Sequence, residues 1–267
     1  MRWGVFVRTL LAWYCALAVG GFARAGAFLL GEGDFQIISA SRFTGSVHAF
    51  GNAGKLNPVG YYSKFELSPY IEYGAADYLT LIAQPTLTRA MAEGPPAGSF
   101  YGLGSIEAGA RFRLGEWEQT VFSAQAVAHI AIARDALNPA LVGNTGNEFD
   151  LRLLAGRSFK IGDFDAFADA QAGYRFRSAG SPNEIRADFT IGVRPFRRLQ
   201  LLAQSFNTIA PASGAPGFPA FRQHKIQLTA LFDISKRYTI YSGLFTTIAG
   251  RSARQEYGMV SGFAYRF

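Results

Sequence analysis

Apolar residues alternate with small or polar residues along most of this chain, and the last eleven residues show the pattern most clearly. Counted back from Phe267, every second position is aromatic, apolar or serine: Tyr265, Phe263, Ser261, Met259 and Tyr257. The positions between them are small or polar: Arg266, Ala264, Gly262, Val260, Gly258 and Glu256. Because successive side chains of a strand point to opposite faces, this period of two predicts a β-strand with two different faces.

The same alternation predicts about twelve strands, and no stretch of useful length has a helical period. The expected strands are 34–48, 61–74, 78–90, 101–113, 119–133, 147–160, 164–177, 184–195, 199–209, 221–233, 238–249 and 255–267. Tight turns (75–77, 115–118, 162–163, 196–198, 234–237) alternate with mostly longer loops rich in Gly, Pro, Asn and Ser (51–60, 91–100, 134–146, 178–183, 210–220, 250–254). This arrangement is typical of outer-membrane barrels. We therefore predict an all-β fold, a transmembrane antiparallel up-and-down β-barrel.

Aromatic residues concentrate near both ends of the predicted strands, as expected where rings lie at the level of lipid headgroups. The turn side has Tyr73, Tyr78, Trp117, Phe159, Phe164, Tyr238 and Tyr265, and the loop side has Tyr61, Phe149, Phe176 and Tyr257. A soluble β-sandwich would explain the alternation, but it would explain neither these two girdles nor the terminal Phe267.

The first 25 residues have the features of a cleaved secretory signal peptide. Arg2 and Arg8 precede an apolar segment at 9–19, and Ala23-Arg24-Ala25 forms a cleavage site of small residues. The apolar segment is shorter than the roughly 20 residues of a spanning helix, which disfavours an uncleaved anchor. We expect 1–25 to be removed, together with the single cysteine Cys15, and 26–267 to form a single barrel in the bacterial outer membrane.

Only about eight residues, 26–33, precede the first predicted strand. They are too few for a plug domain, so we expect any occlusion of the lumen to come from loops or side chains. The terminal Phe267 resembles the residue by which outer-membrane barrels are recognised for insertion. It predicts the barrel-assembly machinery as a partner, with outer-membrane lipid and lipopolysaccharide around the barrel.

Composition and charge agree with a barrel whose outer face contacts lipid and whose inner face contacts water. The chain is 49% hydrophobic and 17% charged, and its formal charge of +7 includes three arginines of the signal peptide. No basic run is interleaved with aromatic residues, so nucleic-acid binding is not expected.

Strand parity directs many charged side chains into the lumen. It places Asp150 and Glu184 near Arg175 and Arg177, and Asp165 near Lys160. These charges either form a field that selects a solute or neutralise one another in pairs, and we favour pairing for most of them. The residues predicted to line the lumen and set selectivity are Glu107, Arg111, Arg152, Asp169, Arg175 and Arg186, with Tyr70 and Tyr241 as inward rings that could stack on an aromatic solute.

Catalytic and metal-binding patterns are weak. Ser123 and His129 lie on one predicted strand, six residues and about 20 Å apart, so they cannot hydrogen-bond to each other. The histidines and acidic residues lack metal-ligand spacing. We therefore expect no enzyme activity, no metal and no cofactor.

Two stretches carry a family resemblance. They are Glu66-Leu67-Ser68-Pro69-Tyr70-Ile71-Glu72-Tyr73-Gly74, continued by Asp77-Tyr78-Leu79-Thr80-Leu81, and Gly102-Leu103-Gly104-Ser105-Ile106-Glu107-Ala108-Gly109-Ala110-Arg111-Phe112-Arg113. This hairpin and strand resemble the outer-membrane transporter family of the "MetA-pathway of phenol degradation" type, although Ser105 stands where that family usually has an aspartate. The resemblance implies passage of small solutes, aromatic ones among them, and supplies no catalytic residues.

The hypothesis that follows is a twelve-stranded outer-membrane channel that passes a small aromatic or organic-acid solute through a narrow polar lumen. Two alternatives remain open. One is a closed structural or surface barrel whose loops bind an external partner, and the other is an outer-membrane lipid hydrolase.

Overall fold

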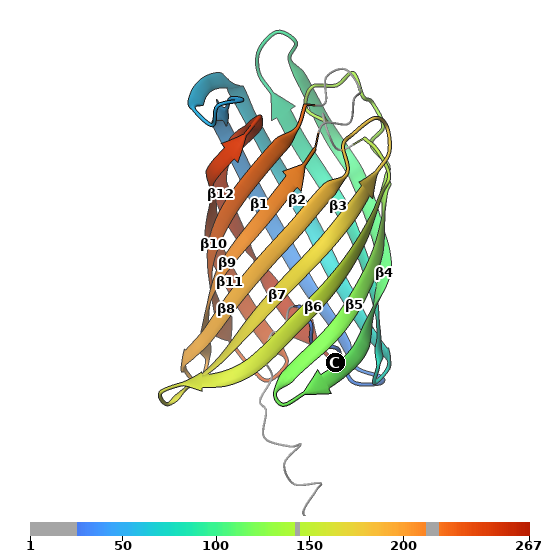
Figure 1. Ribbon diagram of the computed structural model, residues 1–267, viewed down its shortest axis with the longest axis vertical. Helices are drawn as coiled ribbons and strands as arrows, with labels where there is room; N and C mark the ends of the chain where they lie inside the picture. Colours follow the sequence, from blue (N-terminus) through green and yellow to red (C-terminus); the bar gives the residue numbers. More distant parts are fainter. Residues whose placement is uncertain (1–25, 142–144, 212–218) are drawn as a thin grey trace, which may run out of the picture.

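The computed structural model describes residues 26–141, 145–211 and 219–267, so the predicted signal peptide at 1–25 lies outside the described residues. These residues form a closed antiparallel barrel of twelve tilted strands, with short turns at one rim and mostly longer loops at the other (Figure 1). The strands are β1 (Phe35–Phe50), β2 (Leu56–Ala76), β3 (Leu79–Ala92), β4 (Gly98–Trp117), β5 (Thr120–Ala131), β6 (Glu148–Ile161), β7 (Phe164–Arg177), β8 (Glu184–Phe196), β9 (Leu199–Ala210), β10 (Phe221–Asp233), β11 (Tyr238–Arg251) and β12 (Ala253–Arg266).

Each strand pairs with the next one in the sequence, and the first pairs with the last. The β1–β12 ladder runs from Gln36 opposite Arg266 to Phe50 opposite Ala253. The sheet therefore has no free edge. Closure therefore pairs the backbone N–H and C=O groups of every strand, for which lipid offers no hydrogen-bond partners. No helix among the described residues is long and apolar enough to cross a membrane.

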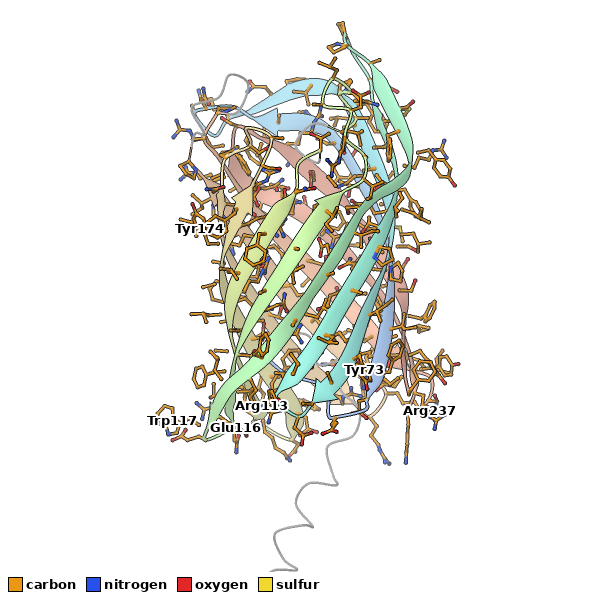
Figure 2. All side chains as sticks on the ribbon, turned by 90° about the vertical axis from the view of Figure 1, so that its right-hand side faces the viewer. Tyr73, Arg113, Glu116, Trp117, Tyr174 and Arg237 are labelled. Atoms are coloured by element: carbon orange, nitrogen blue, oxygen red, sulfur yellow. The ribbon has the colours of Figure 1, made fainter. Side chains whose placement is uncertain are left out.

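The outer face of the barrel is apolar, and aromatic side chains gather at its rims. Tyr73 and Trp117 lie at the turn rim and Tyr174 lies toward the loops (Figure 2). Trp117 is 71% exposed and Tyr78 is 63% exposed. Large exposed side chains between the rims, such as Leu153 and Ile191, would be costly in water but are expected against lipid. The surface is therefore that of a membrane-spanning barrel.

The predicted strands are confirmed, and two of them are clearly longer than expected. β2 begins at Leu56 because Leu56 and Asn57 still pair with the end of β1, although this segment has a loop-like composition. β4 continues to Trp117, which pairs with Thr120 of β5 beyond a register shift after Arg113. Both extensions keep the antiparallel ladder and add length at a rim.

The segment before β1 corrects one expectation. As expected, the described residues include no plug domain. However, the expectation that only loops and side chains occlude the lumen is wrong, because Ala27, Phe28 and Leu29 are buried inside the barrel. Phe28 packs against Val121 and Phe167, side chains that face the lumen from β5 and β7. The backbone of this segment therefore narrows the lumen at the turn side.

The longest loop, between β5 and β6, also folds inward in its described part. Ala140 and Leu141 are buried, and Ala140 packs against Tyr62, Ala90 and Ala92 of the β2–β3 wall. Asn138 supports this conformation by donating to the Ser99 carbonyl at 2.9 Å. The lumen is thus narrowed from the loop side as well.

Candidate functional site in the barrel lumen

One wall of the lumen, formed by β6, β7 and β8, is lined with ion pairs. Arg152 lies between Asp150 at 2.6 Å and Asp188 at 2.7 Å. Arg175 likewise contacts two carboxylates, Glu148 at 2.7 Å and Asp150 at 3.0 Å. These residues meet because the antiparallel register sets Arg175 directly opposite Asp150.

The same wall continues toward the loops with two further arginines. Arg177 contacts Glu148 at 2.7 Å and Glu184 at 3.0 Å, and Arg186 contacts Glu184 at 3.1 Å. The four arginines of this wall (Arg152, Arg175, Arg177, Arg186) thus face four carboxylates (Glu148, Asp150, Glu184, Asp188). The mutual neutralisation favoured from the sequence is confirmed for this wall.

A second cluster surrounds Arg111 of β4 and links three strands to the N-terminal segment. Its guanidinium contacts Glu72 at 3.0 Å and donates to Gln125 Oε1 at 2.9 Å and to Tyr70 Oη at 3.1 Å. It also donates to the Phe28 carbonyl at 3.0 Å. Arg111 and Glu72 are each only 4% exposed, so two buried charges depend on one another.

Polar side chains of the wall bind the backbone of the inserted segment at further points. The Ala27 amide donates to Asp169 Oδ2 at 2.7 Å, and Ser123 Oγ donates to the Ala27 carbonyl at 2.9 Å. The Leu30 amide donates to Thr80 Oγ1 at 3.1 Å. Asp169, predicted as a group that sets selectivity, thus holds the segment in place.

Glu107 belongs to a third group, near the inward loop. Its Oε1 lies 3.1 Å from His129 Nδ1. His129, Lys64, Glu66 and Leu141 are among the residues that line a small cavity of about 60 Å³, which has room for a few water molecules. Lys64 and Glu66 form their own ion pair at 2.9 Å.

The wall formed by β11, β12 and β1 holds a residue that the sequence reasoning missed, Arg42. Its guanidinium lies over the Phe245 ring, 5.1 Å from the ring centroid. Tyr241, the predicted stacking residue, lies on the same wall and donates to the Ser39 carbonyl at 3.2 Å. Strand parity could have found Arg42, because it alternates with Ala40 and Thr44 and is the one Lys, Arg, Asp or Glu residue in β1.

The predicted lumen residues therefore fall into separate groups. Arg152, Arg175 and Arg186 share the β6–β8 wall, and Arg111 and Tyr70 share the buried cluster. Asp169 lies on the same wall, on β7, but it binds the inserted segment instead of an arginine. Glu107 and Tyr241 each lie elsewhere, with the partners given above. No single site unites them.

The chemistry of a hydrolase is not assembled around Ser123 and His129. Ser123 donates to a backbone carbonyl, and His129 pairs with Glu107. No group of three or more His, Cys, Asp or Glu side chains in the described part of the chain is placed to hold a metal ion.

Comparisons with known proteins agree with this architecture. No protein-family model matches the sequence, and no curated protein matches it significantly. Among solved structures, the chain is similar to the COG4313 outer membrane channel from Pseudomonas putida F1, with a TM-score of 0.69 and 15% identity over 92% of this chain and 100% of that one.

Two autotransporter barrels are also similar. The beta domain of the Bordetella autotransporter BrkA gives a TM-score of 0.55 and 14% identity, covering 88% of this chain and 100% of that one. The translocator domain of the autotransporter NalP from Neisseria meningitidis gives a TM-score of 0.51 and 15% identity, covering 97% of this chain and 94% of that one. At these identities the likeness shows the fold, which is that of a bacterial outer-membrane β-barrel.

Proposed function

We propose that this protein is an outer-membrane channel that passes small organic solutes, aromatic or acidic ones among them, through a narrow polar lumen. The observation that carries the proposal is the set of polar side chains that line the lumen from many strands. Charged or amide side chains enter the lumen from β2, β4, β6, β7, β8 and β10, among them Glu72, Arg111, Asp150, Arg175, Asp188 and Gln227. A barrel with a purely structural interior could be filled with apolar side chains at lower electrostatic cost.

The size of the solute follows from the barrel and its two constrictions. Twelve strands enclose a lumen between that of filled eight-stranded barrels and that of open sixteen-stranded porins. The inserted segment at Phe28 and the inward loop at Leu141 reduce it further. These features support a solute of about the size of one aromatic ring, and they disfavour oligosaccharides or peptides.

The lining also supports weak rather than tight binding. Conduction requires sites from which a solute can leave again. On the β6–β8 wall each arginine already has carboxylate partners, so a passing anion competes with fixed charges instead of meeting a bare cation.

The experiment is uptake into proteoliposomes that contain the refolded mature protein. We expect them to take up small monocarboxylates and phenols faster than protein-free vesicles, and to exclude a trisaccharide. A heat-modified control sample, in which the barrel is unfolded, should add no uptake. Equal exclusion of every solute by a folded barrel would contradict a channel that is open at rest.

A second candidate function is a closed barrel whose loops bind an external partner. The observation that favours it is the number of hydrogen bonds that hold the inserted segment, from Asp169, Ser123, Arg111 and Thr80. The uptake experiment separates the two. Removal of the segment (26–30) would open a channel that is occluded at rest, whereas a closed structural barrel would remain impermeable.

A further inference from the structure

Arg42 is an excess positive charge in its part of the lumen. Two ion pairs lie near it. Glu66, directly opposite Arg42 on β2, pairs with Lys64 at 2.9 Å, and Glu256 on β12 pairs with Lys225 at 2.5 Å. Each carboxylate of this group is therefore matched by a lysine. Among the described residues the Arg42 side chain has no carboxylate within ion-pair distance and no hydrogen-bond partner, so it is a third cation beside two acids that are already paired.

Arg42 is held by an aromatic ring rather than by an acid. The Phe245 ring lies under its guanidinium at 5.1 Å and is 5% exposed. A cation on an aromatic face is stabilised without being neutralised, and it keeps its N–H groups available. This differs from the other lumen arginines described above, whose guanidinium groups donate to carboxylates.

Two glycines let aromatic rings of β11 extend across β12 toward β1. A Cβ atom on Gly258 would lie 2.9 Å from the Phe245 ring, and one on Gly262 would lie 2.9 Å from Tyr241 Oη. Tyr241 reaches the Ser39 carbonyl of β1, on the far side of β12, at 3.2 Å. Both rings therefore cover a strip of small residues and lie on the same wall as Arg42.

These contacts place the guanidinium of Arg42 and the aromatic ring of Tyr241 on one wall of the lumen. A guanidinium matches the two oxygens of a carboxylate, and a partly exposed tyrosine ring offers a stacking surface to a planar group. We propose that Arg42 and Tyr241, with Phe245 holding the guanidinium, bind the carboxylate and the ring of a small aromatic monocarboxylate. The proposal rests on the proposed function and gives its lumen a solute class.

The test is the binding of 4-fluorobenzoate to the refolded mature protein in detergent, followed by fluorine NMR line broadening. We expect weak, saturable binding that unlabelled benzoate displaces. Cyclohexanecarboxylate and benzyl alcohol, which lack the aromatic ring and the carboxylate respectively, should displace it at least severalfold less well. Displacement by cyclohexanecarboxylate as effective as that by benzoate would overturn the aromatic assignment.

The same binding measurement on variants tests whether the solute binds at Arg42 and Tyr241. Arg42→Gln should weaken binding about tenfold, because it removes a charge-assisted pair of hydrogen bonds. Tyr241→Leu should weaken it severalfold. The matched control is Arg89→Gln, which removes the same charge from an exposed position of β3 outside the lumen and should bind like the unaltered protein. Unchanged affinity in Arg42→Gln would overturn the proposal, provided that the variant still shows the heat-dependent gel shift of a folded barrel.

The outcome is distinguishable from a failure of the channel itself. Binding that depends on Arg42, without benzoate uptake by proteoliposomes, would leave this site standing and contradict transport. Uptake that is equal for Arg42→Gln and the unaltered protein, with unchanged binding, would leave the channel standing and contradict this site.

Discussion

At the scale of single residues, Arg111 connects the barrel wall to the inserted segment. Its guanidinium satisfies the buried Glu72 carboxylate and also donates to the Phe28 carbonyl. Removing one partner of a buried ion pair leaves an uncompensated charge, which is more costly than the pair itself is worth. Arg111 is therefore expected to contribute both to stability and to closure of the lumen.

Arg111→Leu should lower the free energy of unfolding by about 3 kcal/mol, because Glu72 remains buried without its partner. The measurement is equilibrium unfolding of the refolded barrel in urea. The double variant Arg111→Leu/Glu72→Leu should recover a large part of the loss, since neither charge then remains. A single variant as stable as the unaltered protein would show that the ion pair is not the source of stability.

Arg175 allows a test of selectivity. Arg175→Glu would place a third carboxylate beside Glu148 and Asp150, so cation permeability should rise severalfold relative to anion permeability. The measurement is the reversal potential across a salt gradient. The control is Arg157→Glu, an equal charge change at an outward and 55% exposed side chain of β6. Equal permeability ratios in Arg175→Glu and the unaltered protein would remove Arg175 from the selectivity-determining residues.

At the scale of elements, the strands were predictable from the sequence, whereas the inserted segment was not. A period of two is a local signal, and it placed β7 and β10 at the residues where the structure has them. The segment depends on contacts such as Ala27 with Asp169, which are 142 positions apart in the sequence. Eight residues of mixed character contain no local sign of which wall they will bind.

The lumen site was predictable only in part. Parity correctly turned Arg175 and Asp150 toward each other, because neighbouring antiparallel strands fix the register. Parity alone did not reveal that Arg42 forms no ion pair, because Glu66, which lies opposite Arg42, pairs with Lys64 instead. The difference between a paired and an unpaired arginine is thus a property of the closed barrel.

Deletion of 26–30 from the mature protein should raise single-channel conductance severalfold, because Phe28 and the neighbouring backbone leave the lumen. Stability should fall as well, since Phe28 leaves an apolar cluster with Val121 and Phe167. A milder variant, Phe28→Ala, should give a smaller increase in conductance. Unchanged conductance after the deletion would mean that the segment does not limit passage.

The β1–β12 seam is a second element whose contribution can be measured. The Phe267 ring packs on Phe35 at 5.2 Å and on Tyr265 at 4.3 Å, while the Phe267 amide donates to the Phe35 carbonyl. Phe267→Ala should cost about 1 kcal/mol of stability through these ring contacts.

The same variant tests the predicted partnership with the barrel-assembly machinery. If that machinery recognises Phe267, Phe267→Ala should reduce the amount of protein that reaches the outer membrane far more than this small stability loss explains. Trp117→Ala, which removes another exposed aromatic ring at the same rim, is the control. Equal amounts of both variants in the membrane would contradict recognition of Phe267.

At the scale of the whole molecule, each strand has one face toward lipid and one face toward the lumen. The outer face is apolar for lipid, and the inner face carries the charges, which are largely paired within the wall. Because the charges form ion pairs, a narrow lumen can be polar without a strong electric field of one sign. Arg42 is the local exception, because its side chain forms no ion pair. The two constrictions, from the inserted segment and from the β5–β6 loop, leave room for small solutes only.

The most direct test of this account is single-channel conductance of the refolded mature protein in a planar bilayer, with benzoate as the blocker. The account predicts small stepwise currents that benzoate reduces and that become larger after deletion of 26–30. A correctly folded barrel that conducts neither with the segment nor without it would contradict the channel. It would leave the closed barrel with an external partner as the better account.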